Sequence, residues 1–118
     1  MSLNKVIIIG NLGKDPEVGT TDGGVSVVKL NVAVSERFKD RNGEYKDITE
    51  WITARVWRQQ ADFICKYGKK GSQVCVEGRL HTDRWDGRDG QKHEQVLIEA
   101  DRVQLLGKKE SDDEDMLF

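Results

Sequence analysis

The stretch E-W-I-T-A-R-V-W-R, from Glu50 to Arg58, decides the fold, and its pattern is that of a β-strand. Side chains of a strand alternate between its two faces. One face then carries three small aliphatic residues, which are Ile52, Ala54 and Val56. The other face carries two indoles with a guanidinium between them: Trp51, Thr53, Arg55 and Trp57. The aliphatic face is the one that a sheet would bury.

The opposite face has a composition that neither a core nor an ordinary solvent-facing strand explains. A core would exclude the charge of Arg55, and a plain solvent face would not carry two tryptophans. Flat aromatic rings interleaved with cations suit a flexible polyanion whose bases can stack. From this stretch alone, a tryptophan pair packed under a loop and covered by arginine stems remains the alternative.

Four further strands and one short helix are expected around this strand. Apolar runs and turn residues bound the strands at Lys5–Gly10, Val25–Ser35, Gln73–Trp85 and His93–Leu106, with the opening stretch extending over about Asp47 to Arg58. Asn42-Gly43, in the polar loop from Lys39 to Lys46, is a hairpin signal. Between Gln60 and Gly68, Ala61, Ile64 and Tyr67 have helical spacing. Residues Val28, Leu30, Val32, Val34, Val74, Val76, Gly78, Leu80, Val96, Ile98, Ala100 and Val103 are predicted to point inward.

This order of elements predicts an all-β fold, a five-stranded OB-fold Greek-key barrel with one short helix between the third and fourth strands. In that fold the face of strands 2 and 3 binds oligonucleotides, which is where the aromatic stretch falls. An SH3-like barrel also has five strands and stays open as an alternative.

Length and composition predict one barrel domain, residues 1–107, followed by a short acidic tail, residues 108–118. No apolar run reaches the roughly 20 residues of a membrane helix, and Val6 to Ile9 is too short for a signal peptide. Cys65 and Cys75 lack metal-ligand spacing, so we interpret them as reduced thiols of a cytoplasmic protein. We interpret His81 and His93 as solvated strand residues.

The net charge of −2 conceals an uneven distribution. Residues 110–118 hold five acids and no base, which leaves 19 basic and 16 acidic residues in positions 1–109. A mildly basic body with an acidic tail is typical of a nucleic-acid-binding domain that carries an interaction tail.

Five segments resemble, in order, the bacterial single-stranded DNA-binding proteins, and they cover nearly the whole chain. They are Asn4 to Glu17, Ser35 to Phe38, Thr49 to Trp51, Lys70 to Val74 followed by Glu77 to Leu80, and Arg84-Trp85. The resemblance implies an OB-fold subunit, usually of a homotetramer, that binds single-stranded DNA without sequence preference. It also implies four stacking positions, which here are Phe38, Trp51, Trp57 and Trp85. Phe38 stands where many members have Trp, and Trp57 where many have Phe.

The chain's end, Asp112-Asp-Glu-Asp-Met-Leu-Phe118, is similar to the acidic tip of that family, with Met116-Leu117 replacing Ile-Pro. A terminal aromatic ring with its carboxylate fits an apolar pocket that has a basic rim, and preceding acids steer the encounter. The residues assigned to this role are Asp113, Glu114, Asp115, Met116, Leu117 and Phe118, and the resemblance implies replication and repair proteins as partners. A disordered solubilising end is the alternative. The short connection from Gly107 to Ser111 is compatible with a phage or plasmid origin.

Seven cations near the rings are candidate phosphate contacts: Arg37, Arg55, Arg58, Lys69, Lys70, Arg79 and Arg84. The sequence shows no catalytic, cofactor-binding or metal-binding motif, so we expect no enzyme activity, cofactor or metal. An RNA-binding OB module, a β-barrel that binds proteins through exposed tryptophans and a primosome-type accessory protein remain as alternatives.

Overall fold

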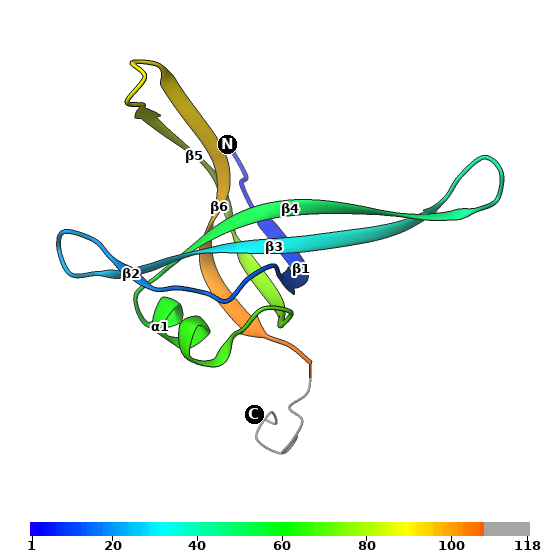
Figure 1. Cartoon of the computed structure of the whole chain (residues 1–118), viewed down its shortest axis with the longest axis horizontal. Helices are drawn as coiled ribbons and strands as arrows, with labels where there is room; N and C mark the ends of the chain where they lie inside the picture. The colour runs from blue at the N-terminus through cyan, green and yellow to red at the C-terminus, as the bar shows by residue number, and fades with distance from the viewer. Residues whose placement is uncertain (108–118) are drawn as a thin grey trace.

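A computed structural model describes residues 1–107 and shows a five-stranded closed barrel from which two long hairpins project (Figure 1). The strands are β1 (Val6–Leu12), β2 (Gly19–Thr20), β3 (Ser26–Lys39), β4 (Tyr45–Trp57), β5 (Gln73–Asp86) and β6 (Lys92–Leu105). The one helix of this part of the chain, α1 (Arg58–Tyr67), lies between β4 and β5. The predicted OB-fold barrel is confirmed; β2 is a two-residue addition to it that the sequence did not indicate.

Closure of the barrel follows from the strand pairings. The sheet order is β1-β5-β6-β4-β3-β2, and an additional antiparallel pairing of β1 with β3 joins the two ends. The contact between β4 and β6 is short and parallel, with Ala54 opposite Ile98 and Arg55 opposite Glu99. Strand β4, which carries Trp51 and Trp57, therefore lies between β3 and β6 in the middle of the barrel wall.

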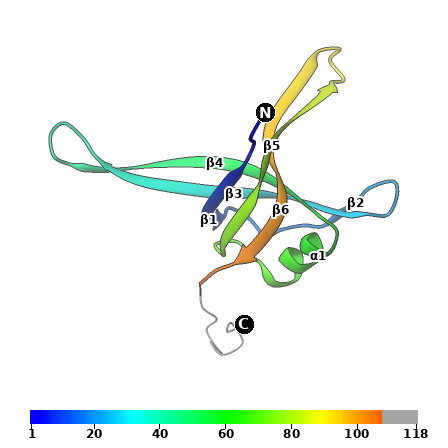
Figure 2. The same ribbon diagram turned by 180° about the vertical axis from the view of Figure 1, so that it is seen from behind.

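The core fills the barrel with small aliphatic side chains. Its fully buried members include Leu30, Val32, Ala54, Val56, Val74, Val76 and Ile98. Helix α1 covers one end of the barrel with Ala61 and Ile64, both buried (Figure 2). The helix ends where the N–H of Gly68 donates to the carbonyl of Ile64 at 2.8 Å, and its first residue, Arg58, has φ +60°.

Two predicted inward positions are wrong, because β5 and β6 run past the core. Leu80 and Val96 are exposed where β5 and β6 leave the barrel, and Tyr67 is exposed at the end of α1 beside Phe63. Leu97 is fully buried instead, although it lies on the outward side of β6 between Gln95 and Glu99. The outward face of the wall thus has a small buried layer of its own.

The β3–β4 hairpin is longer than predicted, since pairing continues to Lys39 opposite Tyr45. The predicted loop from Lys39 to Lys46 shrinks to residues 40–44. Gly43 sits in the turn with φ +82°, a conformation that favours glycine. The carboxylate of Asp40 accepts the backbone N–H groups of Asn42 and Glu44, both at 2.9 Å. This local closure holds the tip of a ribbon that extends beyond the barrel (Figure 1).

Candidate nucleic-acid interface

The two faces of β4 have the roles that alternation predicts. Ala54 and Val56 are fully buried and Ile52 packs against the core. Trp51 and Trp57 lie on the outward side, separated by Thr53 and Arg55. The site is therefore built on a rigid barrel wall, with its aromatic rings facing away from the core.

Trp51 is the most exposed of the four predicted stacking rings, at 63%. It lies opposite Ala33 on β3, and its six-membered ring covers the backbone at Gly13 so closely that a Cβ there would have no room. A residue larger than glycine would displace the ring. One part of the indole thus rests on main chain while the rest is open to solvent.

Phe38 and Trp85 are also exposed, but each lies on a projecting hairpin. Phe38 shares its side of β3 with Val28, Leu30 and Val32, whereas Trp51 belongs to the other side of the same ribbon. Trp85 stacks on His93 across β5 and β6, with ring centroids 5.7 Å apart and planes inclined by 21°. None of the four rings is sealed in the core, and they occupy the wall and both hairpins.

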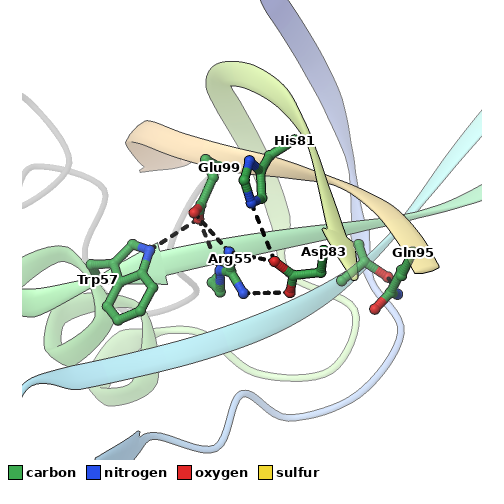
Figure 3. Close-up of polar contacts among 7 residues, drawn as sticks. Arg55, Trp57, His81, Asp83, Gln95 and Glu99 are labelled. Atoms are coloured by element: carbon green, nitrogen blue, oxygen red, sulfur yellow. Dashed lines mark hydrogen bonds and ion pairs between the residues drawn. The ribbon is translucent and has the colours of Figure 1, made fainter. Parts of the chain in front are cut away.

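Trp57 is half-buried, and polar contacts fix its orientation (Figure 3). Its indole N–H donates to Glu99 Oε1 at 3.0 Å. The guanidinium of Arg55 lies 5.4 Å from the centroid of its ring. Glu99 and Arg55 stand opposite each other on β6 and β4, so the sheet register itself brings the three side chains together.

Arg55 lies between two carboxylates (Figure 3). Its Nε and Nη2 donate to Glu99 at 2.9 and 2.8 Å, and its Nη1 and Nη2 donate to Asp83 at 2.6 and 3.1 Å. His81 Nε2 lies 3.3 Å from Asp83. The hydrogen bonds from Arg55 lower the pKa of Glu99 to about 2 and also lower the pKa of Asp83, while they raise the pKa of Arg55.

The other predicted phosphate contacts fall into two groups. Three arginines make exposed ion pairs: Arg37 with Asp47 at 3.3 Å, Arg84 with Glu94 at 3.2 Å and Arg79 with Asp101 at 3.6 Å. Arg58, Lys69 and Lys70 make no ion pair with a carboxylate of residues 1–107. Exposed ion pairs such as those of Arg37, Arg84 and Arg79 contribute little to stability, and their cations exchange readily to other anions.

Tyr45 is an aromatic side chain that the sequence analysis missed. It is 65% exposed near the tip of the β3–β4 hairpin. Arg37 and Lys39 lie over its ring, 5.7 and 6.0 Å from the centroid. Counting the register back from the Asn42-Gly43 turn would have placed Tyr45 opposite Lys39 and on the same side of β4 as Trp51.

A pocket of about 470 Å³ opens beside Trp57. Its lining comes from the β2–β3 loop, β4, β5 and β6: Thr21, Val25, Trp57, Arg58, Arg79, Glu99, Ala100 and Asp101. Two arginines and an indole thus meet at one concave surface.

No three His, Cys, Asp or Glu side chains of residues 1–107 are grouped to hold a metal ion. No helix in the described part of the chain is long and apolar enough to cross a membrane. The tail residues Asp113, Glu114, Asp115, Met116, Leu117 and Phe118 lie outside the described residues.

Comparison with known proteins finds one family that matches nearly the whole described chain. The profile of the single-strand binding protein family matches residues 3–106. The chain is 46% identical over 110 residues to single-stranded DNA-binding protein 1 of Chlorobaculum tepidum, and 42% identical over 107 residues to the single-stranded DNA-binding protein of Neisseria meningitidis. These alignments cover 92% and 91% of this chain but only 68% and 62% of the relatives.

Solved structures agree with this comparison. The SSB of Plasmodium falciparum in complex with ssDNA superposes with a TM-score of 0.79 at 32% identity, covering 91% of this chain and 97% of that one. A deletion variant of the single-stranded DNA binding protein from Thermus aquaticus gives a TM-score of 0.77 at 31% identity. That match covers 89% of this chain and 51% of the other.

Proposed function

This chain belongs to the single-strand binding protein family, and we propose that it binds single-stranded DNA without sequence preference along its outward aromatic rings. The observation that carries the proposal is the outward face of β4, where Trp51 is open to solvent and Trp57 borders a pocket. A base stacks on any π-face, and each stack contributes about 1–3 kcal/mol. Trp85 and Tyr45 extend this aromatic surface onto the two hairpins, and Phe38 is an exposed ring on the other side of the β3–β4 ribbon.

The phosphates are expected to follow the exposed cations. Arg58, Arg79 and Arg37 lie next to rings that stack bases in this proposal, while Lys69, Lys70 and Arg84 are exposed elsewhere on the barrel and the β5–β6 hairpin. Each phosphate contact releases counterions, so the logarithm of the binding constant should fall with the logarithm of salt concentration by about 0.7 per contact.

Assembly into a homotetramer is part of the proposal. Ile7 and Ile9 on β1 are both more than half exposed, an unusual setting for β-branched apolar residues in the middle of a strand. A second copy of the chain would cover them. Light scattering should give a mass of about four chains, and Ile7→Glu should reduce it without unfolding the barrel.

The tail is proposed to recruit partner proteins of replication and repair. This part of the proposal rests on the acidic residues and the apolar end of 112–118. Deleting Asp112–Phe118 should abolish partner capture and tighten DNA binding slightly, because the acids no longer compete for the basic surface. Unchanged partner capture by the truncated chain would refute the tail assignment.

The decisive experiment is a titration of intrinsic tryptophan fluorescence with oligo-dT. Stacked indoles should be strongly quenched, and the apparent affinity should fall with salt as stated above. A matched oligo-U competitor separates DNA from RNA preference, since an RNA module would read the 2′-OH. Absence of quenching at concentrations of DNA that saturate related binders would favour a protein partner for the exposed rings.

A further inference from the structure

Trp57 differs from the other two tryptophans in that a carboxylate holds its indole N–H. Its N–H is bonded to Glu99, and the guanidinium of Arg55 lies against the ring at 5.4 Å. Arg55 does not line the pocket that opens beside the same indole. The pocket therefore borders the indole without contact from this cation, and that part of the ring is left for a ligand.

Arg55 has little capacity left for a phosphate. Of its five N–H groups, four donate to Glu99 and Asp83, and its side chain is only 16% exposed. With two carboxylates around one guanidinium, these three side chains carry a net negative charge. A phosphate would have to displace a carboxylate in order to reach the cation, so this part of the wall repels the DNA backbone.

The pocket beside the indole has both cations and carboxylates in its lining. Its volume of about 470 Å³ lies within the range of small-molecule pockets. Arg58 and Arg79 are exposed cations in its lining, Arg79 being paired with Asp101 at 3.6 Å, and Trp57 supplies a π-face. Arg58 also has φ +60°, a strained backbone conformation of the kind that gathers at functional sites.

We infer that Glu99 and Arg55 position Trp57 for a base that enters from this pocket, with the adjoining phosphate on Arg58 and Arg79. Glu99 and Arg55 are positioning residues: Glu99 fixes the indole through its N–H, and Arg55 holds the Glu99 carboxylate through two hydrogen bonds without touching DNA. This inference rests on the proposed function and assigns Arg55 a role other than the phosphate contact that its sequence position predicts.

The positioning role is tested in a protein whose only indole is Trp57, made by Trp51→Phe and Trp85→Phe, which keep aromatic rings at both places. In this background Glu99→Leu removes the acceptor of the indole N–H, whereas Glu99→Gln keeps an acceptor oxygen. Glu99→Leu should lose most of the quenching by saturating oligo-dT and weaken binding about tenfold. Glu99→Gln should retain most of the quenching. Equal quenching in both variants would overturn the positioning role.

The assignment of the phosphate is tested by the salt dependence of binding in the full-length chain. Arg58→Gln and Arg79→Gln change exposed side chains, and each should lower the slope by about 0.7. The double variant Arg55→Gln with Glu99→Gln leaves the summed charge of the cluster unchanged and should leave the slope unchanged. A fall of about 0.7 in the slope for the double variant, or an unchanged slope for either single variant, would contradict the assignment.

These outcomes are separable from failure of the proposed function. If the unmodified chain neither binds oligo-dT nor shows quenching, the proposed function itself is wrong. If it binds while the indole of Trp57 is not quenched in the single-tryptophan protein, only the pocket assignment fails.

Discussion

The barrel wall and the β3–β4 hairpin each place a guanidinium beside an aromatic ring, yet the two pairs are in opposite states. On the wall, Arg55 lies 5.4 Å from Trp57; on the hairpin, Arg37 lies 5.7 Å from Tyr45. The side chain of Arg55 is 16% exposed and held by two carboxylates, whereas that of Arg37 is 67% exposed with a single carboxylate, Asp47. The contact between a guanidinium and a ring therefore belongs to a mostly buried ion-pair cluster on the wall, whereas on the hairpin it leaves the guanidinium accessible to a ligand.

The difference arises from the neighbouring strands rather than from the pair itself. On the wall, β5 and β6 bring Asp83 and Glu99 beside β4. The hairpin ribbon is two strands wide at its tip, so no third strand adds a carboxylate there. A cation beside an aromatic ring is thus a better candidate for a phosphate contact on the hairpin, where Arg37 has one exposed carboxylate partner, than on the wall, where Arg55 has two.

The largest expected contrast is in stability. Arg55→Met leaves two mostly buried carboxylates without their partner, so the free energy of unfolding should fall by about 3 kcal/mol. The matched change on the hairpin, Arg37→Met, should lower it by less than about 0.5 kcal/mol. Urea denaturation of both variants measures this. Similar losses in the two variants would remove the distinction between the regions.

Acid should destabilise the wall through the same contacts. The pKa of Glu99 is lowered to about 2 and that of Asp83 is also lowered, so their ionised forms stabilise the fold at neutral pH. That contribution is complete above the unfolded pKa of about 4.3 and is lost as pH falls towards 2. Because the side chain of Glu99 is 14% exposed, its share is about 2–3 kcal/mol.

The measurement is thermal unfolding between pH 7 and pH 2 for the unmodified chain and for Glu99→Gln. The variant should be less stable at pH 7 and should lose less stability on acidification, since Gln does not titrate. Parallel curves for the two proteins would show that Glu99 is not held ionised by Arg55.

The hairpin should contribute to DNA binding rather than to stability. Tyr45→Ala removes an exposed ring that lies near two cations of β3, and affinity for a long oligo-dT should fall by about 1 kcal/mol, roughly fivefold. Tyr45→Phe keeps the π-face and serves as the control, with affinity close to that of the unmodified chain. Fluorescence anisotropy of a labelled oligonucleotide measures both. Equal weakening by the two substitutions would assign the effect to the hydroxyl instead of the ring.

The smallest expected effect comes from the ion pair of Arg37 with Asp47, next to the ring of Tyr45. Asp47→Asn frees Arg37 from its carboxylate and should strengthen DNA binding slightly at low salt, by a few tenths of a kcal/mol. The same anisotropy titration at low and high salt measures it. A loss of affinity would mean that Asp47 orients Arg37 for the phosphate.

Much of this architecture follows from local sequence patterns. Alternation along β4 correctly divided Ala54 and Val56 from Trp51 and Trp57, because a strand in a barrel wall has one face buried. The Asn42-Gly43 turn was also correctly identified, since few sequences permit the positive φ found at Gly43. These features depend on residues close together in the chain.

The features that were missed depend on contacts between distant strands. The guanidinium of Arg55 is occupied by hydrogen bonds to Asp83 and Glu99, which are 28 and 44 residues further along the chain. Only the parallel β4–β6 contact brings Glu99 beside Arg55. Val96 was expected inward because alternation does not reveal where β6 leaves the barrel. Tyr45 was overlooked because the hairpin pairs beyond the expected strand end.

The most direct test of the account is photochemical crosslinking of a bromodeoxyuridine oligonucleotide to the full chain, with the modified residues identified by mass spectrometry. The account predicts crosslinks at outward aromatic rings on both regions, chiefly Trp51 and Trp57 on the wall and Tyr45 on the hairpin, with none at Arg55. Crosslinks confined to surfaces that lack these rings, with Trp51 and Trp57 unmodified, would contradict it.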